Sequence, residues 1–333
     1  MGGTSTAANQ SCVIMRPGHH HADKCRPFSS TSRALSASSS GSVSPEEVAH
    51  FDTLASTWWD ADRNPLIAMN PTRVSYIVET LRTTTAAAGG GGGGGGISSM
   101  IGDRGKFSSP QRPLHGLRAL DVGCGGGLLS ESLARLGAGV CAVDPSVEVA
   151  KAARLHSKHH PLTKTIDYRG GTSVEELARE LTAVDIDDDG DDDSVHAGAN
   201  NTKTTAELFD LVCVLEVVEH ATDPQSLLDS ACRLLRPGGL LFVSTLNRTA
   251  KSYILAIAGA EHIMRMVPVG THTWEKFLSP AEVAGMITSS KEAKMEVVDV
   301  CGMVLKPPFI DMKWTLDRND TDVNWIGAYR KEK

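Results

Sequence analysis

The chain has 333 residues and a formal net charge of −7 at pH 7, so no overall positive charge points to nucleic acid as a partner. No apolar run approaches the ~20 residues that a membrane-spanning helix needs. The seven cysteines are scattered and form no CxxC pair, which argues against a disulfide framework and against a zinc knuckle. Length and composition therefore allow one large globular domain or two small ones.

The first 43 residues do not have the composition of a folded segment. They are rich in serine and poor in large apolar residues. They contain several basic residues but a single acidic residue, Asp23. This composition is typical of a mitochondrial transit peptide, and the segment Arg26–Ser29 is similar to a matrix-processing site. The alternative is a disordered tail without a targeting role. We expect residues 1–43 to be disordered and to direct the chain to the mitochondrion.

Two helices are expected before the first strand. The segment Ser44–Trp59 begins with a capping serine and a proline, and its two adjacent tryptophans are either packing residues or part of a lid over the active site. A second helix is expected to open at Met69–Arg73, with Arg73 on its first turn. A cation there opposes the helix dipole, so Arg73 is either an exposed arginine or a ligand for an anionic group.

Two low-complexity stretches interrupt the pattern of helices and strands. One covers about residues 86–112 and contains eight consecutive glycines, and the other covers about residues 185–204 and is dense in aspartate. The second differs from a calcium loop because it lacks glutamate at the twelfth position. Neither stretch can bury a core. We expect flexible insertions in a single domain over residues 44–333.

The segment Leu117–Asp144 predicts a strand, a glycine loop, a helix and a second strand, which is one half of a nucleotide-binding α/β unit. A dinucleotide fingerprint starting at Gly123 would need glycine at position 128, where the chain has leucine. The pattern resembles motif I of class I S-adenosylmethionine methyltransferases instead. Asp144, at the end of the second strand, can accept hydrogen bonds from both ribose hydroxyls. The alternative is a purely structural turn.

A second group of polar residues follows the apolar strand Phe209–Leu215. Glu216, Glu219 and His220 come within one turn of its end, where ligands of α/β sheets bind. Two carboxylates and an imidazole can hold magnesium, and a hydroxyl bound to a dication loses its proton more readily. Alternatively, the segment only caps the next helix and shapes the pocket. His220 or Glu219 is then the candidate general base.

The segment Asn247–Gly270, after the next expected strand, is strongly apolar. Glu261, His262 and Arg265 interrupt it, so it does not span a bilayer. It could cover the substrate or lie on a membrane surface. The chain is expected to close with a helix after Ser279 and two further strands.

Six stretches together resemble one family, the ubiquinone-biosynthesis O-methyltransferases in their mitochondrial form, which act on polyprenyl catechols and demethyl-ubiquinols. The similarity runs from about Phe51 to Ala284 outside the two insertions, whereas the stretch KPPFIDMKWTLDRND departs from the family pattern. The six stretches are FDTLASTWWD, NPTRVSYI, LDVGCGGGLLSESLARLGA, EVVEHATDPQSLL, LRPGGLLFVSTLNRTAKSYILAIAGAEHIMRMVPVGTH and FLSPAE.

The resemblance implies a fold, a donor and a substrate. The fold is an α/β class I methyltransferase domain with a seven-stranded, mostly parallel sheet, helices on both faces, N-terminal lid helices and a helical insertion. The donor is S-adenosylmethionine, and the substrate is a polyprenylated catechol or hydroquinone. Two alternatives are a methyltransferase acting on a soluble phenol or carboxylate and a non-catalytic scaffold.

The resemblance also implies site residues and a location. A divalent ion, expected to be magnesium, would bind Glu216, Glu219 and His220. The protein would lie peripherally on the matrix side of the mitochondrial inner membrane, within a multi-subunit quinone-biosynthesis complex. The implied contacts with adenosylmethionine come from Arg73, Gly123, Asp144 and Leu215.

Overall fold

The computed structural model describes residues 41–89, 111–182, 208–255, 273–307 and 312–333. These belong to one compact unit, which covers Leu35–Lys333. The expected leader lies outside the described residues, apart from Gly41–Val43, and so do the aspartate-rich stretch and most of the glycine-rich one. Ser42 is buried, and its backbone N–H donates to Glu175, so the described contacts of the domain include a residue before the expected boundary at residue 44.

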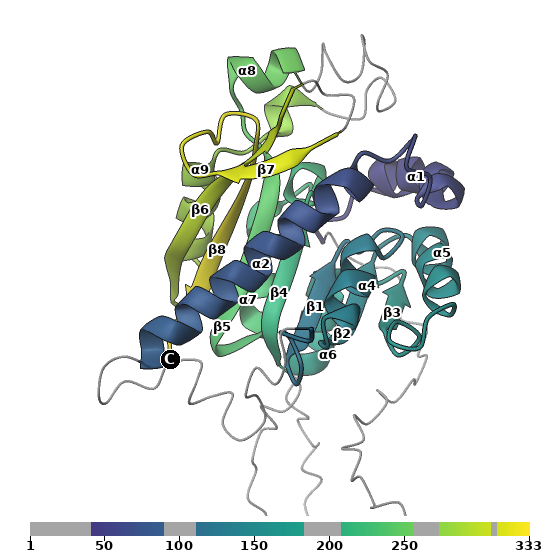
Figure 1. Cartoon of the computed structure of the whole chain (residues 1–333), viewed down its shortest axis with the longest axis horizontal. Coiled ribbons are helices and arrows are strands. Elements are labelled where there is room, and N and C mark those ends of the chain that lie inside the picture. The colour runs from purple at the N-terminus through teal and green to yellow at the C-terminus, as the bar shows by residue number, and fades with distance from the viewer. Residues whose placement is uncertain (1–40, 90–110, 183–207, 256–272, 308–311) are drawn as a thin grey trace, which may run out of the picture. The chain divides into compact units, whose positions relative to one another are not determined.

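A twisted sheet forms the centre of the unit (Figure 1). Its strand order is β3-β2-β1-β4-β5-β8-β6-β7, with parallel pairing from β3 to β5 and antiparallel pairing among the rest. The strands are β1 (Arg118–Val122), β2 (Gly139–Asp144), β3 (Asp167–Gly170), β4 (Phe209–Leu215), β5 (Leu235–Leu246), β6 (Met295–Leu305), β7 (Trp314–Asp317) and β8 (Asn324–Lys331).

The described sheet has eight strands, one more than the seven expected. The extra strand, β7, pairs only with β6 at the edge of the sheet, and all four of its residues are partly exposed. Such a short, half-buried strand has no apolar run to reveal it in the sequence. Strand β3 begins only at Asp167, because the chain first forms turns up to Thr165.

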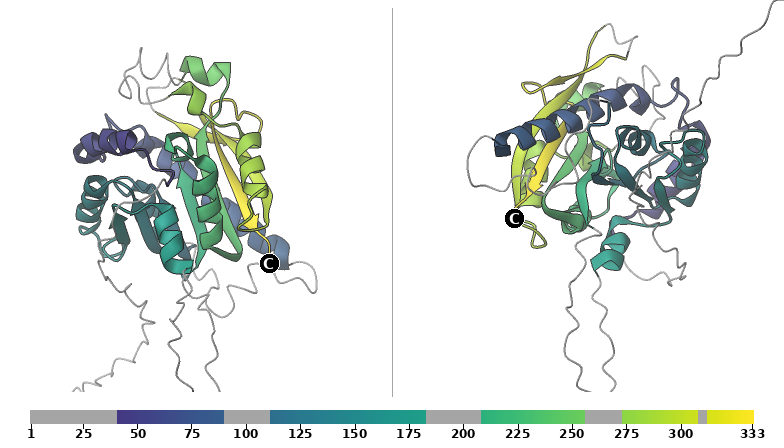
Figure 2. Two further views of the ribbon diagram at one scale, coloured as in Figure 1. Left: turned by 180° about the vertical axis from the view of Figure 1, so that it is seen from behind. Right: turned by 60° about the horizontal axis from the view of Figure 1, so that its bottom comes forward.

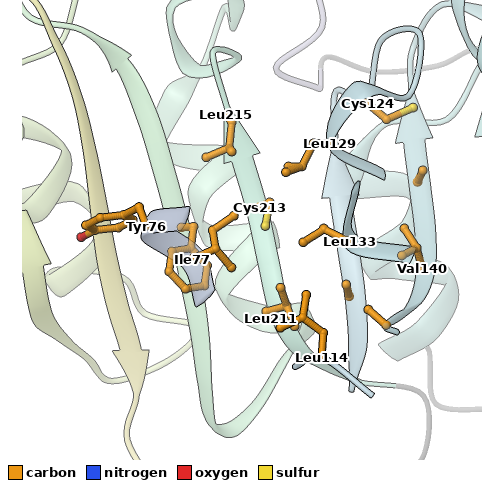
Figure 3. Packing of buried hydrophobic residues seen from close by; sticks show 14 of the residues in the cluster. Tyr76, Ile77, Leu114, Cys124, Leu129, Leu133, Val140, Leu211, Cys213 and Leu215 are labelled. Carbon is orange, nitrogen blue, oxygen red and sulfur yellow. The ribbon is translucent and has the colours of Figure 1, made fainter. Parts of the chain in front are cut away.

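Helices cover both faces of the sheet (Figure 2). One face packs against α2 (Leu66–Gly89), α4 (Leu128–Arg135) and α5 (Val147–Ser157). The other packs against α6 (Val174–Thr182), α7 (Pro224–Leu234) and α9 (Pro280–Thr288). Figure 3 shows side chains from α2, α4 and β4 in the first of these cores, among them Tyr76, Leu133 and Cys213, all fully buried.

Helix α2 begins earlier than expected. It starts at Leu66, whose N–H donates to the Asn64 side chain, and it continues through Pro71. The expected start at Met69–Arg73 was therefore wrong. Pro71 is the sixth residue of the helix, where it cannot donate the backbone hydrogen bond that other residues make to the carbonyl four positions earlier. Arg73 therefore lies about two turns into the helix, not on its first turn.

The shorter helical segments lie around the carboxyl ends of the strands. Two of them, α1 and η1, form the N-terminal segment, and α8 opens the expected insertion after β5. No helix in the described ranges is both long and apolar enough to cross a membrane. The segments are α1 (Pro45–Leu54), η1 (Ala55–Thr57), η4 (Val218–His220), α8 (Ala250–Ser252) and η6 (Trp274–Lys276).

Candidate active site

The glycine loop connects β1 to α4 and touches the segment that follows β4. Gly123 has φ +64°, and a Cβ on it would lie 2.6 Å from Val217 Cγ2. Gly125 has φ +53°, and a Cβ there would lie 2.1 Å from the ring of Trp58. Because β1 and β4 are parallel neighbours, their carboxyl ends meet at one edge of the sheet. Because these glycines have no side chains, the glycine loop lies close to the segment that carries Glu216, Glu219 and His220.

Both tryptophans of the N-terminal segment lie on this loop. Trp58 packs against Gly125 and Gly126, and Trp59 donates its indole N–H to the Gly126 carbonyl at 2.9 Å. Trp59 also stacks on His156 of α5, with ring centroids 3.6 Å apart. The N-terminal helices therefore cover the glycine loop, as expected of a lid.

Asp144 holds the loop to the end of β2. Its carboxylate accepts from the Gly125 N–H at 2.9 Å and from the Ser146 N–H at 2.8 Å. Burial raises the pKa of Asp144 to about 6, although these two backbone hydrogen bonds lower it. A carboxylate has about four acceptor positions, so Asp144 keeps capacity for the ribose hydroxyls that the sequence assigns to it.

Arg73 and Glu216 form a buried ion pair. Arg73 Nη2 lies 3.3 Å from Glu216 Oε1, and their side chains are 4% and 12% exposed. Arg73 is thus not the exposed arginine of the alternative interpretation. Its Nε and Nη2 have no well-oriented hydrogen-bond acceptor among the described residues. Buried polar groups are normally hydrogen-bonded, so these N–H groups are available to an anionic ligand.

Glu216 adopts a strained backbone conformation at the end of β4. Its φ is +57°, which is unfavourable for any residue other than glycine and costs on the order of 1–3 kcal/mol. Two contacts with Ser244 of β5 hold it there. The Glu216 N–H donates to the Ser244 carbonyl at 2.9 Å, and the Ser244 hydroxyl donates to Glu216 Oε1 at 2.6 Å. Leu215, the residue before it, is buried in the core beside this pair.

Glu219 and His220 lie on the short helix η4. Glu219 is buried, and its Oε2 has no hydrogen-bond partner in the described part of the chain. Burial, with a contribution from the nearby charge of Glu216, raises the pKa of Glu219 to about 7. His220 Nδ1 lies 3.1 Å from Glu47 Oε2, on α1. Burial alone would lower the pKa of His220, but the hydrogen bond to Glu47 and the charges of Glu219 and Glu47 raise it.

The three expected metal ligands are close in the chain but do not surround a common point. Within the described ranges, no group of three His, Cys, Asp or Glu side chains is arranged to hold a metal ion. Glu216 is engaged by Arg73 and Ser244, and His220 Nδ1 is engaged by Glu47. The donor set nevertheless has two features of a cation site. The buried Glu219 Oε2 lacks a partner, and His220 leaves Nε2 free while Nδ1 faces a carboxylate, as metal-binding histidines commonly do.

Three residues of this site were missed in the sequence. Neither Glu47, on the first turn of α1, nor Ser244 of β5 was among the predicted site residues. Asp52 of α1, which accepts a hydrogen bond from the Ser146 hydroxyl, had no distinguishing neighbour. Each acts on a partner distant in the chain, so no local spacing could have indicated it.

We predict that Gly125→Ala weakens adenosylmethionine binding at least tenfold, or about 1.4 kcal/mol. The alanine would have an unfavourable positive φ, and its methyl group would collide with Trp58. Calorimetric titration of the two proteins with the cofactor measures the effect. Gly285→Ala is the matched control, because in the described part of the chain no atom outside its own helix lies within 4 Å of a Cβ at this position in α9. Equal affinities for both variants would contradict the prediction.

Comparisons with known proteins agree with this geometry. A family model described as a methyltransferase domain matches residues 97–300. A ubiquinone biosynthesis O-methyltransferase of Cereibacter sphaeroides is 39% identical over 293 residues, covering 87% of this chain and 98% of the relative. The protein of the same name from Roseobacter denitrificans is 39% identical over 288 residues, covering 86% of this chain and 95% of the relative. That from Xanthomonas oryzae pv. oryzae is 38% identical, covering 80% and 87%.

The extent of these matches confirms the resemblance that the six sequence stretches indicated. The relatives are matched over nearly their whole length, so the similarity is not confined to the cofactor-binding half of the sheet. The chain therefore belongs to the ubiquinone biosynthesis O-methyltransferase family, and it is an adenosylmethionine-dependent O-methyltransferase.

Proposed function

We propose that this protein transfers the methyl group of adenosylmethionine to a hydroxyl of a polyprenylated catechol or hydroquinone in ubiquinone biosynthesis. The observation that carries the proposal is the contact between the glycine loop and the segment after β4, at Gly123 and Val217. This contact brings a nucleotide-binding loop next to His220 and Glu219, the only groups that the sequence offered as proton acceptors. Relatives named for ubiquinone biosynthesis support the substrate class.

We assign the cofactor contacts to groups whose hydrogen-bonding capacity is not used up by the described residues. Arg73 would bind the methionyl carboxylate through the N–H groups that lack acceptors. The loop at Gly123 would accommodate the methionyl part, and Asp144 would accept hydrogen bonds from the ribose. Leu215, at the end of β4, would contact the cofactor on the side of the Arg73–Glu216 pair.

The reaction needs alignment and the removal of one proton. The hydroxyl oxygen forms a bond to the methyl carbon as the bond from that carbon to sulfur breaks, so the sulfonium becomes a neutral thioether. Holding the two reactants in line contributes up to about 7–11 kcal/mol. With Nδ1 directed at Glu47, His220 presents Nε2 as the nitrogen with a free lone pair. Glu219, whose pKa is about 7, is a second buried base near neutral pH.

We include magnesium in the proposal, at Glu216, Glu219 and His220. A bound dication would supply the charge that the partnerless Glu219 oxygen lacks and would make the substrate hydroxyl more acidic. Because the three side chains do not converge as they stand, binding requires at least one of them to change rotamer.

Methyl transfer to a short-tailed catechol, followed with the full chain, tests this proposal. We expect transfer to stop after chelation, to return with magnesium, and to fall by about 10²–10⁴ in kcat for His220→Gln. His159→Gln, at an exposed histidine at the end of α5, is the control. If transfer survives chelation, magnesium is excluded and His220 is the general base. If wild-type protein methylates no catechol, the substrate class is wrong.

We propose that the insertion after β5 meets the membrane surface and the isoprenoid tail. Its described beginning has three consecutive exposed apolar side chains, Tyr253, Ile254 and Leu255, which are 51%, 60% and 47% exposed. Runs of large exposed apolar residues commonly mark interaction sites. The remainder of the segment lies outside the described residues.

Sedimentation with anionic liposomes tests this membrane contact. Ile254→Asp with Leu255→Asp should reduce the bound fraction at least tenfold, because each side chain contributes ~1.5–3 kcal/mol when fully buried. Leu155→Asp, at an exposed leucine of α5, should leave binding unchanged. Equal binding of all three proteins would overturn the proposed contact.

We propose that the first 43 residues direct the protein to the matrix side of the mitochondrial inner membrane, where it joins a multi-subunit complex. Import of labelled chain into isolated mitochondria should protect it from protease, and Arg16, Arg26 and Arg33 changed together to Gln should abolish this protection. On native gels the imported chain should migrate above its own mass of 35.4 kDa. Equal protection of both chains would rule out the targeting role.

A further inference from the structure

Glu47 joins three parts of the chain that are far apart in sequence. One carboxylate oxygen lies 3.1 Å from His220 Nδ1, and the other lies 3.0 Å from Lys276 Nζ. Glu47 belongs to α1, His220 to η4 after β4, and Lys276 to η6 after the insertion. The side chains of Glu47 and His220 are only 23% and 16% exposed, so the pair is largely shielded from solvent.

The position of this pair is fixed by contacts other than its own. Phe51, one turn further along α1, packs edge-on against the His220 ring with centroids 5.0 Å apart. Before the helix, the Ser42 carbonyl accepts a hydrogen bond from the Thr222 N–H at 2.8 Å. Contacts on both sides of Glu47 therefore hold α1 against the segment that carries His220.

A carboxylate can only accept hydrogen bonds, so the proton shared with Glu47 lies on Nδ1 of the histidine. Nε2 then carries a lone pair when the ring is neutral, and it has no hydrogen-bond partner in the described part of the chain. Free histidine in water does not have its tautomer fixed in this way. Lys276 restrains the other oxygen of Glu47 and so limits rotation of its carboxylate.

We propose that Glu47 is a positioning residue for His220, which fixes the Nδ1–H tautomer and the ring orientation so that Nε2 faces the reaction as an electron-pair donor. Lys276 supports Glu47 in this role. The role of Nε2, as proton acceptor or as metal ligand, rests on the proposed function. The Nδ1–H tautomer is expected in either case.

A purely structural role is the rival explanation, because an ion pair between α1 and η4 could simply anchor the helix. Glu46 separates the two explanations. It is the neighbouring acid on the same turn of α1, and among the described residues its carboxylate accepts a side-chain hydrogen bond from the capping Ser44 hydroxyl alone. Glu46→Gln removes the same charge from the same helix without touching His220.

The kinetic test uses the full chain and the catechol assay. Glu47→Met, which has no acceptor, should lower kcat about 10–100-fold, the usual effect of removing the carboxylate behind a functional histidine. The KM for adenosylmethionine should stay within about twofold of wild type, since Glu47 does not contact the glycine loop. Glu47→Gln, which restores an acceptor, should recover part of kcat. Glu46→Gln should behave as wild type, and thermal unfolding of all variants checks that they fold.

A spectroscopic test needs no turnover. In metal-free protein labelled with ¹⁵N-histidine, at a pH where the ring is neutral, His220 should show the Nδ1–H tautomer, with the resonance identified by its absence in His220→Gln. Glu47→Met should shift it toward the Nε2–H form. An Nε2–H tautomer in wild type, or a tautomer and a kcat that Glu47→Met leaves unchanged, would overturn the proposal. If the wild-type protein does not methylate catechols, the proposed function is wrong. The measured tautomer of His220 then still shows whether Glu47 fixes it.

Discussion

The close approach of the glycine loop to the segment after β4 is the constraint on which the rest of the site depends. Parallel pairing of β1 with β4 brings both strand ends to one edge, but only a residue without Cβ at position 123 lets the backbone lie against Val217. A side chain there would separate the loop from Glu216, Glu219 and His220. The two groups of residues on which the proposed site is built would then lie further apart.

The N-terminal segment adds contacts to the loops at the carboxyl ends of three strands. Asp52 accepts from Ser146 beyond β2, Trp58 covers the glycine loop, and Glu47 engages His220 beyond β4. The short N-terminal segment of α1, η1 and Trp58 thus contacts both the glycine loop and the residues that follow β4. An element with no buried residues of its own has little intrinsic reason to stay folded alone, so its order depends on these contacts. The contacts act together, because Phe51 and Ser42 also hold α1 against the segment that carries His220.

The sequence allowed prediction of those features whose signal is local. The glycine loop, β1, β2, β4 and the capped helices α1 and α9 all have their determinants within a few residues. The start of α2 was misplaced although a local signal marks it, because Asn64 followed by Pro65 is a capping residue before a proline, and the Asn64 side chain accepts from the Leu66 N–H. Arg73 was selected by a helix-dipole argument that does not apply two turns into a helix. Glu47 could not be found at all, because its partner lies 173 residues away.

The charges buried between α2 and β4 indicate what kind of ligand the site is built to receive. Among the described residues, Arg73 has N–H groups without a well-oriented acceptor, while Glu219 has an oxygen without a donor and a pKa of about 7. An anion alone would satisfy Arg73 but would raise the pKa of Glu219 further. A cation alone would satisfy Glu219 but would compete with Arg73 for Glu216. A ligand set that brings an anion to the arginine and a cation to the glutamates would satisfy both, as the carboxylate of adenosylmethionine and the magnesium ion of the proposed function would do together. Glu216, held by Ser244, pairs with Arg73, and its charge raises the pKa of Glu219, so Glu216 interacts electrostatically with both groups.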